Sequence, residues 1–509
     1  MDPKLVAAAR AAFPKQGDRI ALGAPLREGE CLPEPLVSLP LAMANRHGLI
    51  AGATGTGKTK TLQLVAEQLS AAGVPVFLAD LKGDLSGIAA PGEADERVLT
   101  RARDTGFAWH AAGAPVEFYS LTGKRGAQVR ATVSSFGPLL LAKVLELNDT
   151  QTSVLSLVFK FCDDHGLELY DFADLRAALQ HLSGPGAAEL ASYGGVSKQS
   201  VGVLLREMVE LEGQGALAFF GEPELELADL ARVAPDGRGV VSVLELSDVQ
   251  DKSALFSTFM MWLLAKLQGE LPEVGDAPKP KLVFFFDEAH LLFRNASRAF
   301  LDQVGQVVRL IRSKGVGVFF VTQSPKDVPA EILGQLGHRI QHALRAFTAD
   351  DAKALAAAAR TFPKSEFYDI ERTLQSLGIG EALIATLDPN GVPTPSFATR
   401  LIPPGSRMGP LGEAEFAAAL ATPVARKYAA AVNRDSAAEK LARQDAPKAL
   451  PTEQDDTPVR RGSAPPAEES FGTAIADALN SPLARTIAGT ITRGLMGALL
   501  GPPRRRRRS

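Results

Sequence analysis

The sequence contains very little cysteine: Cys31 and Cys162 are the two cysteines among 509 residues, and they lie in unrelated contexts. This scarcity excludes a disulfide framework and a zinc site built on thiolates. The seven histidines are scattered without the spacing of metal ligands. Such a chain is expected to work in a reducing compartment, which predicts a cytoplasmic protein without a cysteine- or histidine-based metal centre.

Long apolar runs are also missing. No run approaches the roughly 18 residues that a membrane-spanning helix needs. The first residues lack the apolar stretch and small-residue cleavage site of a signal peptide, so we expect no stable membrane insertion. Hydrophobic residues make up 46% of the chain and charged residues 22%. These values are ordinary for globular protein, and the length suggests about three domains.

Positive charge is scarce outside the last residues of the chain. The net charge is −3, and Arg504 to Arg508 contribute five positive charges, which leaves 50 basic against 58 acidic side chains elsewhere. Affinity for nucleic acid comes mainly from neutralising phosphates. An acidic body therefore argues against a broad nucleic-acid-coating surface, although it is compatible with a narrow basic channel.

Strand and helix signals alternate in two stretches of the chain. Short apolar runs are separated by Gly-rich loops and helical patterns, such as the amphipathic helix predicted at 59–72. This alternation predicts an α/β fold whose mostly parallel sheet is covered by helices. The expected strands are 49–51, 76–79, 116–119, 240–244, 282–286 and 316–322.

The rest of the chain differs from this alternating core. Residues 131–235 show four helical patterns, at 139–147, 154–162, 172–182 and 196–211, and are predicted to form a helical insertion. The core is then divided into two parts. Residues 1–46 form a Pro-rich lead-in with little periodicity, and the α/β core consists of 47–130 and 236–402. The chain then continues with a helical extension at 403–443, a disordered linker at 444–470, and an amphipathic helix with an Arg tail at 471–509.

One segment carries a specific motif for phosphate binding. Gly52-Ala53-Thr54-Gly55-Thr56-Gly57-Lys58-Thr59 fits G-x-x-x-x-G-K-[ST] at every fixed position, between a predicted strand and a predicted helix. The glycines let backbone N–H groups close around phosphate oxygens. Lys58 would reach the β- and γ-phosphates, and the Thr59 hydroxyl would bind Mg²⁺. We count Lys60, at the start of the helix, among the nucleotide-binding candidates.

A buried strand at 282–286 ends in two carboxylates, Asp287 and Glu288. Ligands of open α/β folds bind at the carboxyl edge of the sheet, where such charges are otherwise costly. Asp287 would hold Mg²⁺ through its water shell, and Glu288 would orient or deprotonate the attacking water. The alternative is a pair that starts a helix. The five apolar residues directly before the pair favour the site.

Three further groups carry weaker signals. Gln323 closes a predicted strand and would sense the γ-phosphate, unless its polarity is that of an ordinary loop. Arg309 and Arg312 lie off the apolar stripe of a helix predicted at 297–314. They would either reach the phosphates of a neighbouring subunit or form a solvated face. The run Asp80-Leu81-Lys82-Gly83-Asp84 would contribute near the nucleotide or cap its own loop.

A combination of five segments resembles one known family: Gly52 to Thr59, Asp80 to Leu85, Leu147 to Gln151, Asp287 to His290 and Gln341 to Arg345. The chain is similar to the bacterial HerA-like helicase C-terminal-domain proteins, which belong to the HerA/FtsK group of RecA-like ATPases. The resemblance covers roughly residues 15–400 and the helix at 485–500. It implies a RecA-like P-loop NTPase fold, hydrolysis of ATP with Mg²⁺, assembly of this chain into a hexameric ring, and DNA as a partner.

The resemblance also implies roles for single residues. The nucleotide roles fall on Lys58, Thr59, Asp287, Glu288 and Gln323, and the arginine candidates are Arg309, Arg312 and Arg345. HerA itself carries a barrel domain before its phosphate loop, whereas 51 residues precede Gly52 here. Functions that depend on the barrel are therefore not implied.

The string Asp287-Glu288-Ala289-His290 also matches the box of superfamily 2 helicases. In those helicases the box lies much nearer to the phosphate loop, whereas 229 positions separate Lys58 from Asp287 here. We therefore reject that assignment.

Three functional hypotheses follow from these observations. The first is an ATP-driven ring motor that translocates DNA. The second is an ATPase of similar core that remodels or secretes protein, and the third is a nucleotide-gated assembly protein with slow turnover. Glu288 argues against a purely binding role, because a scaffold needs no carboxylate that activates water.

The C-terminal segment has an apolar stripe with a spacing of four residues, typical of one helix face. The helix would either dock on the core or act as a latch between subunits, with Arg485 or Arg493 at a nucleotide site. Residues 504–508 would remain an anion-binding tail for DNA or anionic lipid. The stripe consists of Leu483, Ile487, Ile491, Leu495 and Leu499.

Overall fold

The fold was examined in a computed structural model that describes residues 2–190, 193–294 and 296–445. The linker predicted up to residue 470 and the helix and Arg tail predicted at 471–509 lie outside the described residues, apart from residues 444 and 445, which belong to a helix. Within the described residues, no helix combines the length and apolar character required to cross a bilayer.

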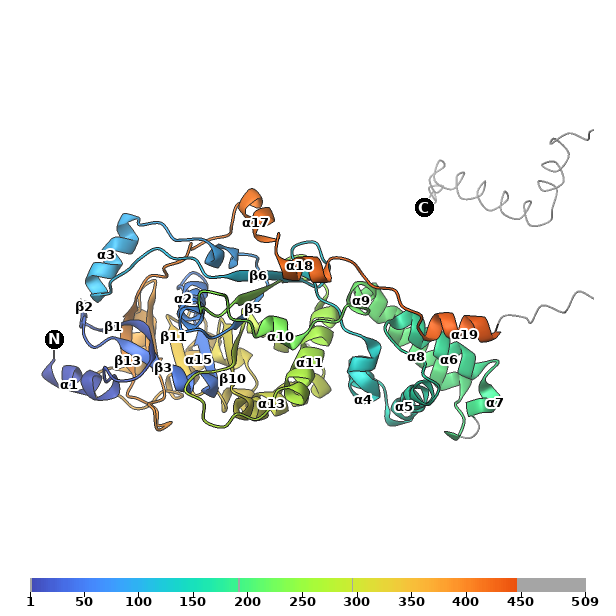
Figure 1. Ribbon diagram of the computed structural model, residues 1–509. Coiled ribbons are helices and arrows are strands. Elements are labelled where there is room, and N and C mark those ends of the chain that lie inside the picture. Colours follow the sequence, from blue (N-terminus) through green and yellow to red (C-terminus); the bar gives the residue numbers. More distant parts are fainter. Residues whose placement is uncertain (1, 191–192, 295, 446–509) are drawn as a thin grey trace, which may run out of the picture. The chain divides into compact units, whose positions relative to one another are not determined.

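The described residues contain one sheet of thirteen strands (Figure 1). The strands in chain order are β1 (Arg19–Arg27), β2 (Glu30–Cys31), β3 (Val37–Pro40), β4 (Gly48–Ala51), β5 (Val76–Asp80), β6 (Val116–Ser120), β7 (Ala127–Gln128), β8 (Val241–Glu245), β9 (Leu282–Phe286), β10 (Val316–Thr322), β11 (His338–His342), β12 (Glu381–Ala385) and β13 (Phe397–Leu401). Their order across the sheet is β2-β1-β13-β12-β11-β4-β10-β9-β5-β8-β6-β7, and β3 pairs with β1.

The sheet has a parallel part and an antiparallel part. All neighbours from β11 through β4, β10, β9, β5, β8 and β6 to β7 are parallel, whereas β12, β13, β1, β2 and β3 pair antiparallel. The six strands predicted from apolar runs all lie in the parallel part. The predicted α/β fold with a mostly parallel sheet is confirmed.

Helices cover both faces of the parallel part. The helices before the insertion are α1 (Pro3–Ala12), α2 (Lys58–Ala71) and α3 (Glu96–Thr105). Those after it are α11 (Ser253–Glu270), α12 (Ala289–Phe293), α13 (Arg298–Leu310), α14 (Ala330–Leu333), α15 (Ala349–Ala359), α16 (Ile370–Ser376), α17 (Glu413–Ala419), α18 (Pro423–Tyr428) and α19 (Ala437–Asp445).

Successive side chains of a strand point to opposite faces, so each buried strand supplies two cores. In β9, Val283 and Phe285 belong to the core that contains Leu62 and Val65 of α2, whereas Phe284 belongs to the core on the other face with α11 and α13. Burial on both faces explains why these strands are continuous apolar runs rather than alternating ones.

The middle of the chain forms a group of helices beside the sheet, which Figure 1 shows in green. Local signals set their starts: Asn148 and Gln151 form a reciprocal capping box before the helix that begins at Asp149, with the Gln151 N–H donating to Asn148 Oδ1 at 3.0 Å. The helices are α4 (Val133–Val144), α5 (Asp149–Asp164), α6 (Phe172–Ser183), α7 (Ala187–Leu190), α8 (Lys198–Gly213), α9 (Ala216–Phe219) and α10 (Leu227–Leu230).

The helical extension returns to this middle group. The Ala438 N–H donates to Asp174 of α6 at 3.0 Å, and the Ala437 N–H donates to the carbonyl of Glu168 at 2.9 Å. Helix α19 consequently packs along α6. Earlier in the extension, Phe416 of α17 packs on Phe118 of β6, with ring centroids 4.6 Å apart.

The first 46 residues differ from the predicted lead-in with little periodicity. Asp2 caps α1, and β1 enters the main sheet beside β13, with Gly23 opposite Leu401. A Cβ at Gly23 would lie 2.2 Å from the carbonyl oxygen of Arg400, so the close strand approach depends on this glycine. The segment is ordered both by its own hairpin pairings with β2 and β3 and by the distant β13, and the distant contact has no local periodic signal.

Candidate active site

The phosphate loop joins β4 to α2 at the carboxyl edge of the parallel strands. Lys58 is the first residue of α2 and is 7% exposed, and its Nζ donates to the carbonyl of Ala53 at 3.1 Å. The Thr56 hydroxyl donates to the same carbonyl at 2.7 Å. Thr59 and Lys60 follow in the first turn, half-buried, where the helix N-terminus favours anions.

Two positions of this loop require glycine because neighbouring segments pack closely against them. A Cβ at Gly52 would lie 2.5 Å from the Cβ of His342, which ends β11. Gly57 adopts φ 109° and would bring a Cβ to 3.3 Å from the backbone nitrogen of Gly380. His342 itself is fully buried with its Nε2 2.8 Å from the Thr61 hydroxyl. Burial lowers the pKa of His342 to about 4, so the ring is neutral below the loop.

Asp287 and Glu288 follow β9 at the same edge and are 2% and 5% exposed. Asp287 Oδ1 accepts the Glu288 N–H at 2.9 Å, whereas Oδ2 is buried and has no hydrogen-bond partner among the described residues. Glu288 has φ 47°, and its side chain does not cap the described helix α12. The geometry is therefore not that of an ordinary helix start.

Lys82, from the loop after β5, contacts the Glu288 carboxylate directly. His290 Nδ1 lies 3.1 Å from the other Glu288 oxygen. Burial alone would raise the pKa of Glu288, but the hydrogen bond and charge of Lys82 outweigh it and lower the pKa below its ordinary value. Lys58 also interacts electrostatically with Asp287 and Glu288, which places both lysines with both carboxylates.

Two further carboxylates are buried on the neighbouring strands. Asp80 ends β5 and pairs in register with Glu245, which ends β8, and both are fully buried. Burial raises the pKa of Asp80 to about 6, that of Glu245 to about 7 and that of Asp287 to about 7. Like charges on adjacent strands act in the same direction. The edge thus gathers buried carboxyl groups beside the lysines.

Of the two roles predicted for the run after β5, the structure shows the loop cap. Asp80 caps its own loop by accepting the N–H groups of Lys82, Gly83 and Leu85 at 3.1, 2.8 and 2.9 Å. This cap holds the loop in the position from which Lys82 reaches Glu288.

Gln323 and Arg345 lie close to the start of the phosphate loop. Both line a cavity of about 310 Å³ together with Ala53, Thr54 and His290. Gln323 directly follows β10, and Arg345 follows β11, so both stand at the carboxyl edge. Both side chains are exposed, and Arg345 Nη1 donates to the carbonyl of Gln375 at 3.4 Å.

Arg309 and Arg312 are not part of this group. The helix predicted at 297–314 ends earlier: α13 stops at Leu310 and a 3₁₀ turn follows at Ile311–Lys314, directly before β10. The two exposed arginines consequently lie near the amino ends of the parallel strands, at the edge opposite the phosphate loop. They cannot reach the nucleotide site of their own chain.

Sequence reasoning missed Glu245 and did not single out His342. Glu245 follows the apolar strand 240–244 as Asp287 follows 282–286, so the same pattern of a buried strand ending in a carboxylate indicates it. His342 carries no local signal, because its position under Gly52 follows from the pairing of β11 with β4. Among the described residues, no cluster of three or more His, Cys, Asp or Glu side chains suits a metal ion.

The sequence matches the family described as helicase HerA-like C-terminal over residues 27–508. The chain belongs to this family. With its phosphate loop and buried carboxylates, this HerA-like protein is a P-loop ATPase of the HerA/FtsK group. No curated protein sequence gives a significant match.

Two solved structures resemble this HerA-like chain, and the first of them shares its fold. The bacterial conjugative coupling protein TrwBdeltaN70 superposes with a TM-score of 0.50 at 14% identity, over 80% of this chain and 94% of that one. VirB4 of Thermoanaerobacter pseudethanolicus gives a TM-score of 0.46 at 17% identity, over 76% of this chain and 97% of that one. At these identities the likeness concerns the fold alone.

Proposed function

We propose that this chain is an ATP-driven motor that assembles into a ring in the cytoplasm and translocates DNA. The observation that carries the proposal is the meeting of Lys58, Lys82, Asp287 and Glu288 at one edge of the sheet. Nucleotide binding with Mg²⁺ would need the phosphate loop and one carboxylate such as Asp287, but no second carboxylate that activates water. Family membership supports coupling of this hydrolysis to movement along DNA.

The residues present suit a Mg²⁺ ion bound with ATP. The buried Asp287 Oδ2 has no hydrogen-bond partner among the described residues, and Thr59 offers a hydroxyl at the start of α2. Mg²⁺ prefers oxygen ligands and keeps several waters, so one hydroxyl and one carboxylate suffice when phosphate oxygens complete the set. When bound, the ion neutralises charge that develops on the phosphates.

The other residues divide the chemistry of hydrolysis among them. Lys58 leaves the Ala53 carbonyl and donates to the β- and γ-phosphates. Glu288 orients a water for in-line attack and accepts its proton, and the low pKa that Lys82 confers keeps this carboxylate ionised. Gln323 and Arg345 are proposed to contact the γ-phosphate, and their shared cavity with Thr54 supports this role.

A ring explains the position of Arg309 and Arg312. An arginine that stabilises phosphoryl transfer has to reach the phosphates. These two lie at the wrong edge for their own site, so they act on a neighbouring copy that presents its phosphate loop to them. A homohexamer is the assembly that the family resemblance favours.

Stimulation of hydrolysis by duplex DNA tests the proposed function. We expect the full chain to hydrolyse ATP faster with DNA at low salt, and the stimulation to decline at moderate salt because phosphate contacts are displaced by counterions. Lys58→Ala is the control for contaminating activity. Equal rates with and without DNA at both salt concentrations would contradict DNA translocation and favour a motor that remodels protein.

A further inference from the structure

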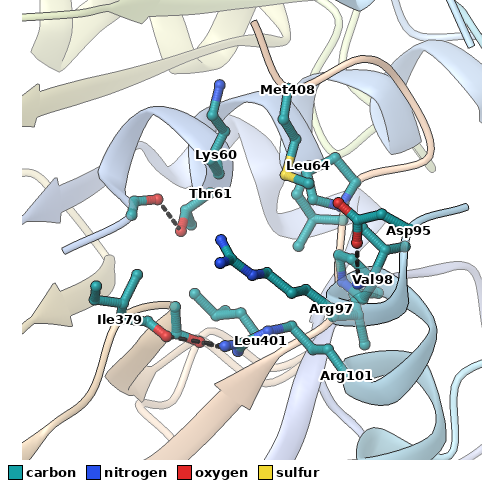
Figure 2. A pocket seen from close by; sticks show the side chains of 15 residues that line it. Lys60, Thr61, Leu64, Asp95, Arg97, Val98, Arg101, Ile379, Leu401 and Met408 are labelled. Carbon is teal, nitrogen blue, oxygen red and sulfur yellow. Dashed lines mark hydrogen bonds between the residues drawn. The ribbon is translucent and has the colours of Figure 1, made fainter. Parts of the chain in front are cut away.

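A second cavity opens at the other end of the phosphate loop. It has a volume of about 260 Å³ and lies between α2 and α3, where Gly57, Lys60 and Thr61 form part of its wall (Figure 2). The first cavity, with Gln323, meets the loop at Ala53 and Thr54 instead. A phosphate chain that runs through the loop therefore has one cavity at each end.

The second cavity is walled mainly by apolar groups. Leu64 and Val98 are buried in its wall, whereas Ile379 is 73% exposed and Met408 is 43% exposed. A single exposed apolar side chain is common on protein surfaces. Two that face one cavity next to a phosphate loop indicate a ligand with a flat apolar surface.

One cation in this cavity has a free planar group. Figure 2 shows the Arg97 guanidinium reaching into the cavity, with no hydrogen bond to the other side chains drawn. Its neighbour Arg101 differs, because it donates to the carbonyls of Gly380 and Ile379, both at 3.0 Å. The Asp95 side chain caps α3 by accepting the Val98 N–H at 2.7 Å, which fixes the turn that carries Arg97.

The wall opposite α3 is tied to the phosphate loop itself. The Gly380 N–H donates to the Thr56 carbonyl at 3.0 Å, and the Leu401 N–H donates to the Gly380 carbonyl at 3.0 Å. Arg101 adds its two hydrogen bonds to the same turn. This wall is thereby held against the phosphate loop by backbone hydrogen bonds together with the Arg101 side chain.

We infer that this cavity binds the nucleoside end of the nucleotide, with the Arg97 guanidinium stacked on the aromatic base and with Ile379 and Met408 as apolar parts of the surrounding wall. Guanidinium groups stack on aromatic rings, and every base offers such a face. The ribose then lies toward Thr61 and the phosphates enter the loop at Gly57. This inference rests on the proposed function, since it places the base of the same ATP molecule.

The test compares binding of ADP and of pyrophosphate to the full chain by calorimetry with Mg²⁺, because neither probe turns over. We expect Arg97→Ala to weaken ADP binding by about tenfold, the effect of losing one stacking contact, and to leave pyrophosphate binding unchanged. Arg97→Lys keeps the charge but not the plane and should recover only part of the loss. Ile379→Ser should weaken ADP binding by a smaller factor.

Arg103→Ala is the matched control, since Arg103 is exposed on the same helix and bonds to Thr100 instead. It should bind both probes as the wild type does. ADP binding by Arg97→Ala equal to wild type, or equal wild-type affinities for ADP and pyrophosphate, would overturn the nucleoside site alone. A wild-type chain that binds neither probe would overturn the proposed function, and the nucleoside site with it.

Discussion

The phosphate loop and the nucleoside cavity adjoin each other, yet they are assembled differently. The loop is one contiguous segment, Gly52–Thr59, between a strand and a helix of the parallel part. The cavity collects side chains from α2, α3, the turn at 379–380 and the segment 401–408. One end of the site is therefore a local structure, and the other depends on segments that lie far apart in the chain.

The two ends also differ in the forces that act in them. Around the loop, buried charges are balanced against one another: Lys82 contacts Glu288, and burial raises the pKa of Asp287 to about 7. In the cavity, apolar side chains and the Arg97 guanidinium, which forms no hydrogen bond with the other side chains drawn in Figure 2, offer dispersion and stacking. Substitutions near the loop should affect chemistry, whereas those in the cavity should affect affinity and local stability.

The largest effect is expected from Lys58→Ala. The lysine donates to Ala53 within the loop and contributes no apolar core contact, so its loss removes phosphate binding and leaves the sheet intact. ATP hydrolysis should fall to background, measured as phosphate release, while the midpoint of thermal unfolding stays close to wild type. Parallel losses of activity and of thermal stability would contradict a role confined to the phosphates.

Glu288→Gln should retain ATP binding but lower kcat by roughly 10²-fold or more, since a general base is lost. Single-turnover hydrolysis and equilibrium binding separate the two steps. Turnover close to wild type would transfer the role to another carboxylate, with Asp84 the first to test.

Mixing the Glu288→Gln chain with the Arg312→Ala chain tests whether the arginine acts on the site of a neighbouring subunit in a ring. Each inactive chain supplies what the other lacks, so mixed assemblies should recover part of the activity if the arginine acts on a neighbouring site. An active chain that is strictly monomeric at assay concentration would contradict this arrangement.

Arg101→Ala should have the smallest effect, and it acts at the cavity end. The two hydrogen bonds to Ile379 and Gly380 are lost, and for a half-exposed guanidinium we expect a destabilisation of about 1–2 kcal/mol. Thermal unfolding measures the stability, and ADP affinity should decline a few-fold as the wall loosens. Arg103→Ala on the same helix is the control. Unchanged unfolding and unchanged ADP affinity would show that the backbone contacts of Gly380 with Thr56 and Leu401 hold this turn without Arg101.

Much of the parallel part could be predicted from the sequence. Runs such as Leu282–Phe286 are apolar because both faces of their sheet are covered, and this pattern is visible along a few residues. The helices of the insertion begin at local caps such as Asn148. The antiparallel strands were not predicted. The pairing of β1 with β13, Gly23 with Leu401, joins distant segments, whereas β1 also pairs with its near neighbours β2 and β3.

The amino-acid sequence by itself determined the phosphate loop, the carboxylates after 282–286 and the alternation that builds the parallel sheet, because each is a property of neighbouring residues. Only the tertiary structure decided that Lys82 contacts Glu288, that Arg309 and Arg312 lie away from their own site, and that Arg97 enters a cavity beside Gly57. These relations depend on which strands and helices are neighbours in space. Strand pairing determines which elements are neighbours. Pairing between segments that are hundreds of residues apart leaves no periodic pattern in the sequence of either segment.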